Sequence, residues 1–230
     1  MRFIALQGTY SSLELGIFSE YDAIAVARYD ELRASSNLIP FLEALLKNNN
    51  VEIKDISFVA VDKGPGAFTS LRATVSSVNG IAFAKNISLI GVNSLEALQV
   101  QASLEIKTGM LQPRFIVALL NAYNNDAYFR IFDQESNIFV DEGCLKIDVI
   151  VDQLKKLAAS VLCVGNGVEL YAQVLEDLGD YLILLPKNPA VPSVHAIASI
   201  ARAQWQNGAG NLVQVIEPYY LKTQLFAIKK

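Results

Sequence analysis

The chain has 230 residues, of which 52% are hydrophobic and 18% are charged, and its formal net charge is −4 at pH 7. No run of about 18 uncharged apolar residues occurs, which argues against a transmembrane helix despite a mean hydropathy of +0.31. The acidic balance, without a cluster of Lys or Arg, argues against strong nucleic-acid binding by the chain alone. The length suits one large domain or two small ones with a sizeable core.

The compartment is predicted from the N-terminus and the cysteines. The opening residues 1–10 contain one basic residue and no apolar stretch of signal length, so we expect no export signal. Cys144 and Cys163 are isolated in the sequence, with no C-x-x-C pair. A reducing cytoplasm is therefore the expected location.

The first half of the chain alternates short apolar runs with longer stretches of helical spacing. Strands are predicted at 2–6, 11–18, 23–29, 56–62 and 87–92, and helices at 31–48, 67–86 and 95–104. Pro40 lies inside the first of these helices, so we expect a bend or a restart there. Asn93 and Ser94 are residue types that cap the start of a helix, here the one at 95–104.

The second half repeats the same order. Strands are predicted at 114–120, 126–133, 137–143, 160–165 and 181–186, and helices at 148–159, 168–179 and 193–205. Each half reads β-β-β-α-β-α and then β-α, which predicts an α/β architecture of two similar lobes. We place the hinge in 101–113, with an N-terminal lobe at 1–108 that carries partner-binding helices and a C-terminal lobe with its helix and tail at 109–230.

Residues 62–73, DKGPGAFTSLRA, join a predicted strand to a predicted helix. A strand, a Gly-x-Gly turn and a helix can together bind an anion at the helix N-terminus. The third glycine of a dinucleotide fingerprint is absent, because Thr69 stands in its place, and no Gly-Lys-Ser/Thr follows. By spacing alone a tight turn is favoured, with Gly66 in a backbone conformation that other residues avoid.

The same segment resembles the signature of the TsaB (YeaZ) family, Gly-Pro-Gly-Ser-Phe-Thr-Gly-Leu-Arg, with Ala67 and Ser70 as mild departures. The matching residues are Gly64, Pro65, Gly66, Phe68, Thr69, Leu71 and Arg72, followed by Gly91, Val92, Ser94 and Leu95. The stretches 37–46 and 217–222 also resemble the Leu-Leu-Pro helix and the Glu-Pro-x-Tyr-Leu-Arg ending of that family. The resemblance implies a two-lobed actin/Hsp70-like (RNase H-like, duplicated) fold.

Two departures from the family pattern concern the chemistry. The first strand ends in Gln7-Gly8-Thr9, where the family has Asp-Thr-Ser/Ala, and the second lobe has Asn121-Ala122-Tyr123 for Asp-Ala-Arg. The carboxylates that organise Mg²⁺ at such strand ends in the wider fold are therefore replaced by amides. We expect no ATP hydrolysis by this chain alone.

What the resemblance implies about function is a supporting role. In this family TsaB dimerises with its paralogue TsaD, which carries the metal and transfers the threonylcarbamoyl group to tRNA, and the ATPase TsaE joins at the junction. The implied partners are thus TsaD, TsaE and, through the complex only, tRNA. The resemblance also implies that the chain alone binds no cofactor tightly and that ATP or ADP lies at the junction of the assembled complex. We expect homodimers when TsaD is absent.

The helix predicted at 67–86 has two stripes. Leu71, Val75, Val78 and Ala82 form an apolar stripe that we expect to face the sheet, and small residues form a second stripe beside it. Gly80 in the middle of a helix costs about 1 kcal/mol relative to Ala. The small stripe either packs on the helix at 31–48 of the same chain or, as the resemblance implies, pairs with TsaD. The predicted partner interface is Ser35, Leu38, Leu42, Arg72, Ala73, Ser77, Gly80, Phe83 and Ala84.

The other candidate groups carry weaker signals. His195 is the single histidine, so a site with two His ligands is impossible, and we expect an ordinary helix histidine. Asp141 and Glu142 are expected in an exposed loop. Tyr219-Tyr220 could stack a base, but a buried aromatic pair in a returning tail is favoured. The alternative function is an independent enzyme of the same fold, a small-molecule kinase or a peptidase-like protein.

Overall fold

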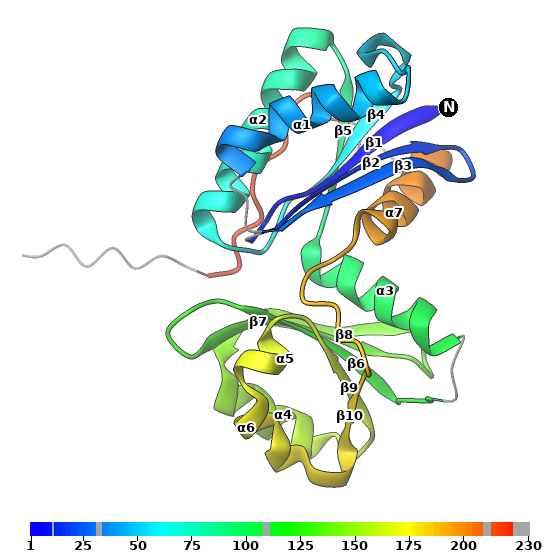
Figure 1. Cartoon of the computed structure of the whole chain (residues 1–230). Coiled ribbons are helices and arrows are strands. Elements are labelled where there is room, and N and C mark those ends of the chain that lie inside the picture. Colours follow the sequence, from blue (N-terminus) through cyan, green and yellow to red (C-terminus); the bar gives the residue numbers. More distant parts are fainter. Residues whose placement is uncertain (11, 31–33, 108–110, 209–212, 223–230) are drawn as a thin grey trace, which may run out of the picture.

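The computed structural model describes residues 1–10, 12–30, 34–107, 111–208 and 213–222, with backbone alone for Ala34 and Ser35. The chain forms two lobes, one above the other, with the helix α3 (Ser94–Lys107) lying between them (Figure 1). In the described part of the chain, no helix is long and apolar enough to cross a membrane.

The N-terminal lobe is a five-stranded mixed sheet with helices on both faces. Its elements are β1 (Arg2–Gln7), β2 (Leu13–Ser19), β3 (Ala23–Tyr29), α1 (Ala34–Asn48), the 3-10 turn η1 (Ile53–Asp55), β4 (Phe58–Asp62), α2 (Phe68–Lys85) and β5 (Ser88–Val92). The strand order is β3-β2-β1-β4-β5. β1 pairs with β2 antiparallel and with β4 parallel, so the carboxyl ends of β1 and β4 meet at one edge of the sheet.

The second half of the chain repeats this plan. Its elements are β6 (Phe115–Asn121), β7 (Asp126–Asp133), β8 (Ile138–Lys146), α4 (Ile147–Lys156), β9 (Val161–Val164), α5 (Gly167–Leu170), α6 (Ala172–Leu175), η2 (Glu176–Tyr181), β10 (Leu182–Leu184) and α7 (Val194–Gln206). The strand order is β10-β9-β6-β7-β8, the order of the first sheet with each strand replaced by its counterpart. The predicted two-lobed actin/Hsp70-like α/β fold is confirmed.

The last helix of each half packs on the sheet of the other half, which differs from the predicted division at residue 108. Leu95 and Leu98 of α3 pack against Ile116 and Leu162 of the C-terminal sheet. Apolar residues of α7 pack on the N-terminal sheet around Phe3, Phe58 and Phe18. Each sheet has an inner apolar face: α3 covers that of the C-terminal sheet, which follows it directly in the chain, whereas α7 covers that of the N-terminal sheet from the far end of the sequence. The lobes in space are therefore not the two halves of the chain.

Two predicted helices differ in detail. The stretch 168–179 forms short turns instead of one helix, because Tyr171 leaves the helical region (φ −114°, ψ 23°) and Gly179 has a φ of +54°. Of the two outcomes expected at Pro40, a restart is wrong, since α1 runs through it as a single helix, and a bend stays a prediction. Proline removes one hydrogen bond there, and the buried face of α1 offsets that loss.

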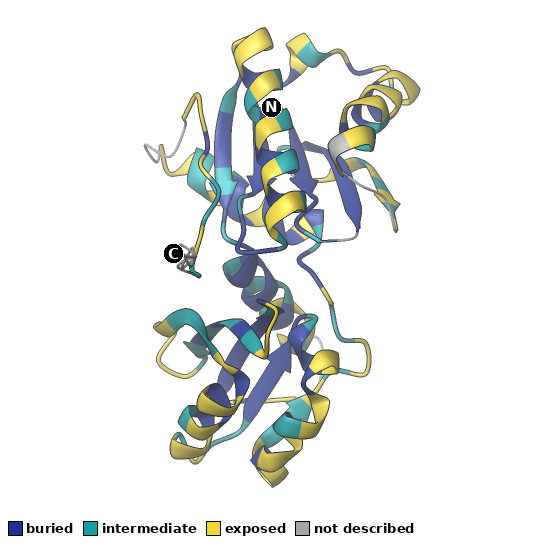
Figure 2. Ribbon diagram, turned by 90° about the vertical axis from the view of Figure 1, so that its left-hand side faces the viewer, coloured by how far each residue is buried: buried dark blue, intermediate teal, exposed yellow. Residues whose placement is uncertain are grey.

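The core of the N-terminal lobe lies between the sheet and the pair α1 and α2, which cover one face together (Figure 1). The stripe predicted to face the sheet is confirmed: Leu71, Val75, Val78 and Ala82 are all buried. Burial of an aliphatic side chain of this size stabilises the fold by about 1.5–3 kcal/mol. The central strands are buried, whereas the edge strands β3 and β8 and the outer sides of the helices are largely exposed (Figure 2). The outer side of α2 is therefore accessible to other molecules.

Candidate functional site

The turn between β4 and α2 is held by hydrogen bonds within the chain. Gly64-Pro65 is a cis peptide, and Gly64 has a φ of +99°. The expected unusual backbone conformation at Gly66 is wrong, since its φ is not in the left-handed region. A glycine is needed there because a Cβ would lie 2.7 Å from Thr9 Cβ and 2.9 Å from Thr9 O. The N–H of Ala67 donates to Thr9 O at 2.8 Å. The second glycine is thus required by a close approach of β1's end to the turn.

Asp62, the last residue of β4, lies at the centre of this turn and is fully buried. Its carboxylate accepts hydrogen bonds from the hydroxyls of Thr9 (3.0 Å) and Ser94 and from the N–H of Gly64 (3.0 Å). Asp62 and Thr9 O thus take up the N–H groups of Gly64 and Ala67, two of the backbone donors in this turn. These contacts support the interpretation of residues 64–69 as a sharp turn. Phe68 and Thr69, also part of the predicted turn, begin α2 and are exposed.

Burial raises the pKa of Asp62 to about 6, against the hydrogen bonds from Ser94, Gly64 and Thr9 that lower it. Because the folded-state pKa lies above the unfolded one, this carboxyl stabilises the fold most at low pH. The contribution is lost as the pH rises from about 4 to 6, by about 3 kcal/mol in total.

We therefore expect Asp62→Asn to remove this pH dependence. Denaturant unfolding between pH 4 and 7 should show a free energy that falls less steeply with pH in the variant than in the native chain. Asp152→Asn, at an exposed position on α4, is the matched control and should keep the native slope. Equal slopes for Asp62→Asn and the native chain would show that Asp62 does not titrate in this range.

The two strand-end amides are engaged within their own lobes. Gln7 is fully buried; its Nε2 donates to Thr9 Oγ1 (3.2 Å), and its Oε1 accepts from Ser12 (3.4 Å). Asn121 accepts from the N–H of Tyr123 through its side chain (2.8 Å), and its own N–H donates to Asn166 Oδ1 (2.8 Å). Neither amide is placed to hold a metal ion, which needs carboxylate or carbonyl oxygens facing it.

A cavity of about 430 Å³ lies between the lobes. Both lobes line it, with Tyr10 and Ser70 on one side and Tyr123 on the other. Asp30, the one carboxylate among its described lining residues, pairs with Arg28 at 3.0 Å. In the described part of the chain, no three His, Cys, Asp or Glu side chains gather in a way that would hold a metal ion. Among the residues that the structure describes, Asp30 is thus the one acidic group in this cleft that could help to organise Mg²⁺ around a nucleotide, and it is already paired with Arg28.

The second candidate region is the outer side of α2, where most of the predicted interface residues lie. Gly80 and Ala84 are exposed, Ala73 and Ser77 are partly exposed, and Phe83 is 90% exposed. A Cβ built at Gly80 meets nothing within 4 Å. Close packing on α1 of the same chain therefore does not explain the glycine at position 80.

The other predicted interface residues divide by position. Leu38 and Leu42 of α1 are buried in their own lobe, at 1% and 4% exposure, so they hold α1 on the sheet and are not available to a partner. Arg72 is exposed, lies over the Phe68 ring at 4.0 Å and donates to the Tyr220 hydroxyl at 2.8 Å. Ser35 lies within α1, and its side chain is outside the described atoms.

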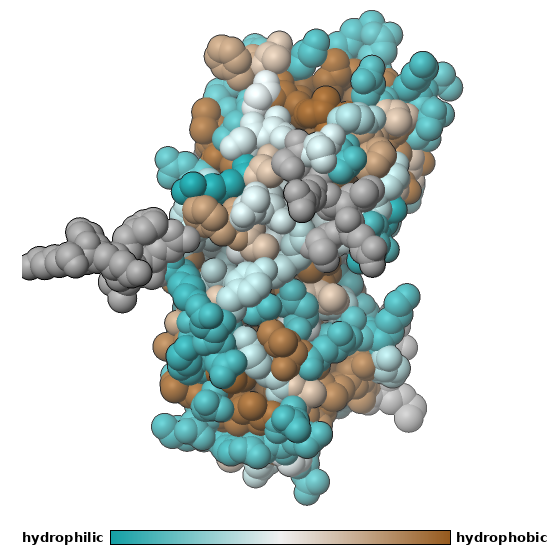
Figure 3. Space-filling view, turned by 60° about the vertical axis from the view of Figure 1, so that its left-hand side comes forward, coloured by the Kyte–Doolittle hydropathy of each residue, from teal (hydrophilic) through white to brown (hydrophobic). Residues whose placement is uncertain are grey.

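Ile39 of α1 is also exposed, at 48%, and was not predicted. Apolar patches among polar residues are visible on this side of the N-terminal lobe (Figure 3). We call the exposed part of α1 and α2 the helical face; its members are Ile39, Ala73, Ser77, Gly80, Phe83 and Ala84. An apolar side chain exposed this fully, beside small residues on one helix, is typical of a surface that another protein covers.

Three further expectations are resolved by the structure. His195 is exposed on α7 with its ring edge-on to Phe18 (5.5 Å), an ordinary helix histidine as expected. Glu142 lies on β8 with its side chain 9% exposed, so its predicted place in an exposed loop is wrong. Tyr219 and Tyr220 do lie in a tail that returns over the fold, but they are half-buried and exposed, respectively, instead of buried.

Asp62 and Glu142 are two structural carboxylates to which sequence reasoning gave no role. Asp62 ends an apolar strand just before the glycine turn, a position that places a carboxylate at the sheet edge, and this signal was available. Glu142 has no comparable local signal, because its partners lie 12, 49 and 77 residues away in the chain.

Comparisons with known proteins agree with this geometry. The model of a family described as TsaD, tRNA N6-adenosine threonylcarbamoyltransferase, matches residues 32–228. The chain is 34% identical over 171 residues to the tRNA threonylcarbamoyladenosine biosynthesis protein TsaB of Buchnera aphidicola subsp. Baizongia pistaciae (strain Bp), covering 71% of this chain and 74% of that protein. It is 20% identical over 229 residues to TsaB of Escherichia coli (strain K12), covering 98% and 96% of the two chains.

Solved structures show the same fold. A protein from Pseudomonas aeruginosa described as similar to the peptidase YeaZ superposes with a TM-score of 0.78 at 20% identity, covering 96% of this chain and 99% of that one. The relatives named TsaB support a role in the biosynthesis of threonylcarbamoyladenosine in tRNA. The chain therefore belongs to the TsaB (YeaZ) family of tRNA threonylcarbamoyladenosine biosynthesis proteins, within the wider family that the TsaD model describes.

Proposed function

We propose that this chain is a non-catalytic subunit that binds the TsaD paralogue through its helical face and, in that pair, supports the recruitment of TsaE. The observation that carries the proposal is Gly80: a glycine in the middle of an 18-residue helix, exposed, with open space around it. A glycine there weakens the helix by about 1 kcal/mol and improves no packing within the chain. A partner helix that approaches the backbone closely would repay that cost.

The rest of the helical face suits the same partner. The side chains of Ala73, Ser77 and Ala84 are small, so the surface beside Gly80 is shallow. The Phe83 side chain projects from this surface and is 90% exposed. A projecting aromatic ring next to a shallow stripe is the shape of an interface anchor, since buried aromatic residues dominate binding energies. A TsaD-like helix pair is the partner proposed, because the chain matches the family model of TsaD itself. In its absence a second copy of this chain would use the same face.

The alternative, an independent small-molecule kinase or peptidase-like enzyme, has weaker support. A kinase needs one acidic residue for Mg²⁺ and another as a base. Gln7 and Asn121 are amides that bond within their own lobes, and Asp62 is enclosed by Thr9, Ser94 and Gly64. ATP or ADP at the junction of the assembled complex would then need its metal ligands from the partner chains, and contact with tRNA would come through the complex.

Reconstitution tests the proposed function. TsaD, TsaE, the threonylcarbamoyl donor and unmodified tRNA are combined with and without this chain, and the modified adenosine is counted by mass spectrometry. We expect omission of the chain to lower modification by more than about tenfold, which corresponds to about 1.4 kcal/mol. The purified chain alone should show no ATP turnover above buffer. Turnover by the chain alone, or full modification without it, would contradict the proposal.

A further inference from the structure

Residues 213–222 run as an extended segment along the N-terminal lobe. Val213 exchanges two backbone hydrogen bonds with Leu89 of β5, at 2.8 and 3.1 Å. Asn79 on α2 holds the backbone of Ile216 with both ends of its amide, donating to Ile216 O and accepting from Ile216 N, each at 2.9 Å. The Ile216 side chain is buried in the core of this lobe. We call residues 213–222 the strap.

The strap then crosses to the C-terminal lobe. The N–H of Tyr219 still donates to Lys63 O of the N-terminal lobe (2.7 Å), while the Tyr219 hydroxyl donates to Glu142 Oε1 on β8 (2.8 Å). Three residues later, the Lys222 ammonium pairs with Asp126 at 2.7 Å. One short segment thus bonds both lobes, and a single residue, Tyr219, bonds each of them.

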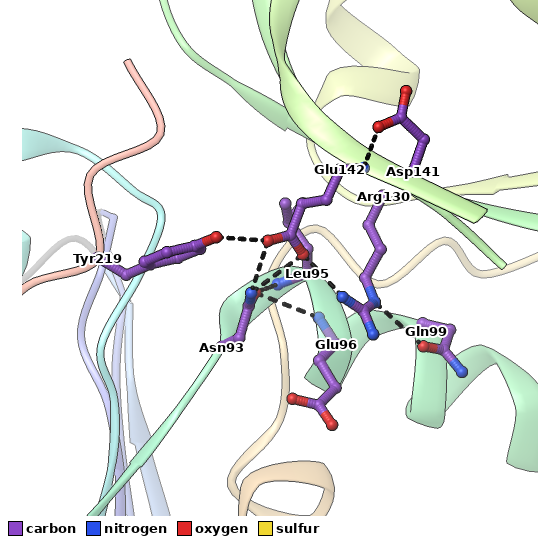
Figure 4. A network of polar contacts seen from close by, with 8 residues as sticks. All are labelled: Asn93, Leu95, Glu96, Gln99, Arg130, Asp141, Glu142 and Tyr219. Atoms are coloured by element: carbon purple, nitrogen blue, oxygen red, sulfur yellow. Dashed lines mark hydrogen bonds and ion pairs between the residues drawn. The ribbon is translucent and has the colours of Figure 1, made fainter. Parts of the chain in front are cut away.

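Glu142 is the point where the strap and the lobes meet (Figure 4). Besides Tyr219 it accepts from Asn93 Nδ2 (3.0 and 3.2 Å), which belongs to the connection between β5 and α3, and from Arg130 of β7 (2.8 Å). Its side chain is 9% exposed. The charge-assisted hydrogen bonds from Arg130, Asn93 and Tyr219 fix the position of the Glu142 carboxylate. Loss of any one donor leaves a buried oxygen with fewer hydrogen bonds, which costs free energy.

The turn between β6 and β7 receives Lys222 through carbonyl oxygens. It contains three consecutive residues in the left-handed region: Tyr123, Asn124 and Asn125. Lys222 donates to Ala122 O at 2.8 Å, and Lys146 donates to Asn124 O at 2.6 Å. Carbonyls that point at ammonium groups make this turn suited to cations and unsuited to a phosphate. The strap supplies the cation from within the chain.

We propose that the strap fixes the angle between the two lobes, so that residues 219–222 act as a built-in ligand that bridges them. The lobes are also joined by the connections β5–α3 and β10–α7, by the packing of α3 on α7 and on the C-terminal sheet, and by hydrogen bonds that include Tyr10 Oη to Asn121 O (2.8 Å) and Asn93 to Glu142. Releasing Tyr219 and Lys222 removes the strap's polar contacts with the second lobe and leaves its N-terminal anchors in place. This inference concerns the geometry of the chain itself and does not rest on the proposed function.

The test measures the distance between the lobes directly in the full-length chain. Spin labels are placed at Lys47→Cys, at the end of α1, and Lys156→Cys, at the end of α4, both exposed. Burial raises the pKa of Cys163 to about 12 and also raises that of Cys144, so both native thiols react slowly; Cys144→Ser removes the less buried one. Labelled chain is diluted in unlabelled chain, and pulsed electron–electron double resonance gives the distance distribution.

The native strap should give one narrow distance. Tyr219→Phe with Lys222→Met, which removes a hydroxyl and an ammonium at nearly constant size, should give a broader distribution with a longer component. Tyr220→Phe is the matched control, since the neighbouring hydroxyl bonds Arg72 of the N-terminal lobe and not the second lobe; it should keep the native distribution. A native distribution in the double variant overturns the proposal. If the double variant melts, the two single variants are measured, and native distributions in both overturn it equally.

Discussion

Replacing Gly80 with leucine is expected to weaken binding to TsaD by about 100-fold, or about 2.7 kcal/mol, without loss of the fold. A leucine at this position would hold a partner helix away from α2 and break the contacts of Phe83 and the small residues beside it. Within the chain the new side chain meets open space, because a Cβ at Gly80 has no neighbour within 4 Å. Isothermal titration calorimetry with purified TsaD, or co-elution on size exclusion, measures the effect.

The stability of the same variant separates an interface effect from misfolding. Because leucine is a better helix former than glycine, Gly80→Leu should leave the free energy of unfolding unchanged or raise it by up to about 1 kcal/mol. Ala203→Leu, which adds a bulky side chain of the same kind on the exposed side of α7, is the control and should bind TsaD normally. Unchanged affinity of Gly80→Leu would show that the helical face is not where TsaD binds, whatever the outcome of the reconstitution assay.

Gly66→Ala is expected to destabilise the N-terminal lobe by about 2–3 kcal/mol. Its methyl group would lie 2.7 Å from Thr9 Cβ and 2.9 Å from Thr9 O. Both contacts are with the end of β1, which cannot move away without breaking the bonds from Thr9 to Asp62 and from Ala67 to Thr9 O. Urea unfolding followed by circular dichroism measures the change in midpoint.

The control for Gly66→Ala is a glycine-to-alanine substitution that should change the free energy of unfolding in the opposite direction. Gly80→Ala is the same substitution on the same lobe, made where the added methyl is free of contacts, and it should stabilise by about 1 kcal/mol. If Gly66→Ala were as stable as the native chain, the close approach between the turn and β1 would not hold in solution. The interpretation of residues 64–69 as a turn closed by Thr9 and Asp62 would then fail with it.

Local patterns in the sequence were sufficient for most of the elements, for the family and for the exposed glycine of the helical face. Period-two and helical spacing gave the strands and the buried stripe of α2, because alternation and amphipathicity are set by neighbours along the chain. The residues 64–72 carried the family resemblance. Gly80 could be singled out because a glycine inside a helix is unfavourable wherever that helix lies.

The tertiary structure alone decided which residues meet across the chain. The packing of α7 on the N-terminal sheet, the enclosure of Asp62 by Thr9 and Ser94, and the bridge from Tyr219 to Glu142 each join residues at least 32 positions apart. No spacing in the sequence encodes such pairs, since they depend on how the two sheets are oriented and connected. The burial of Leu38 and Leu42 follows from the same cause: periodicity shows that a helix has an apolar side, and only packing decides what covers it.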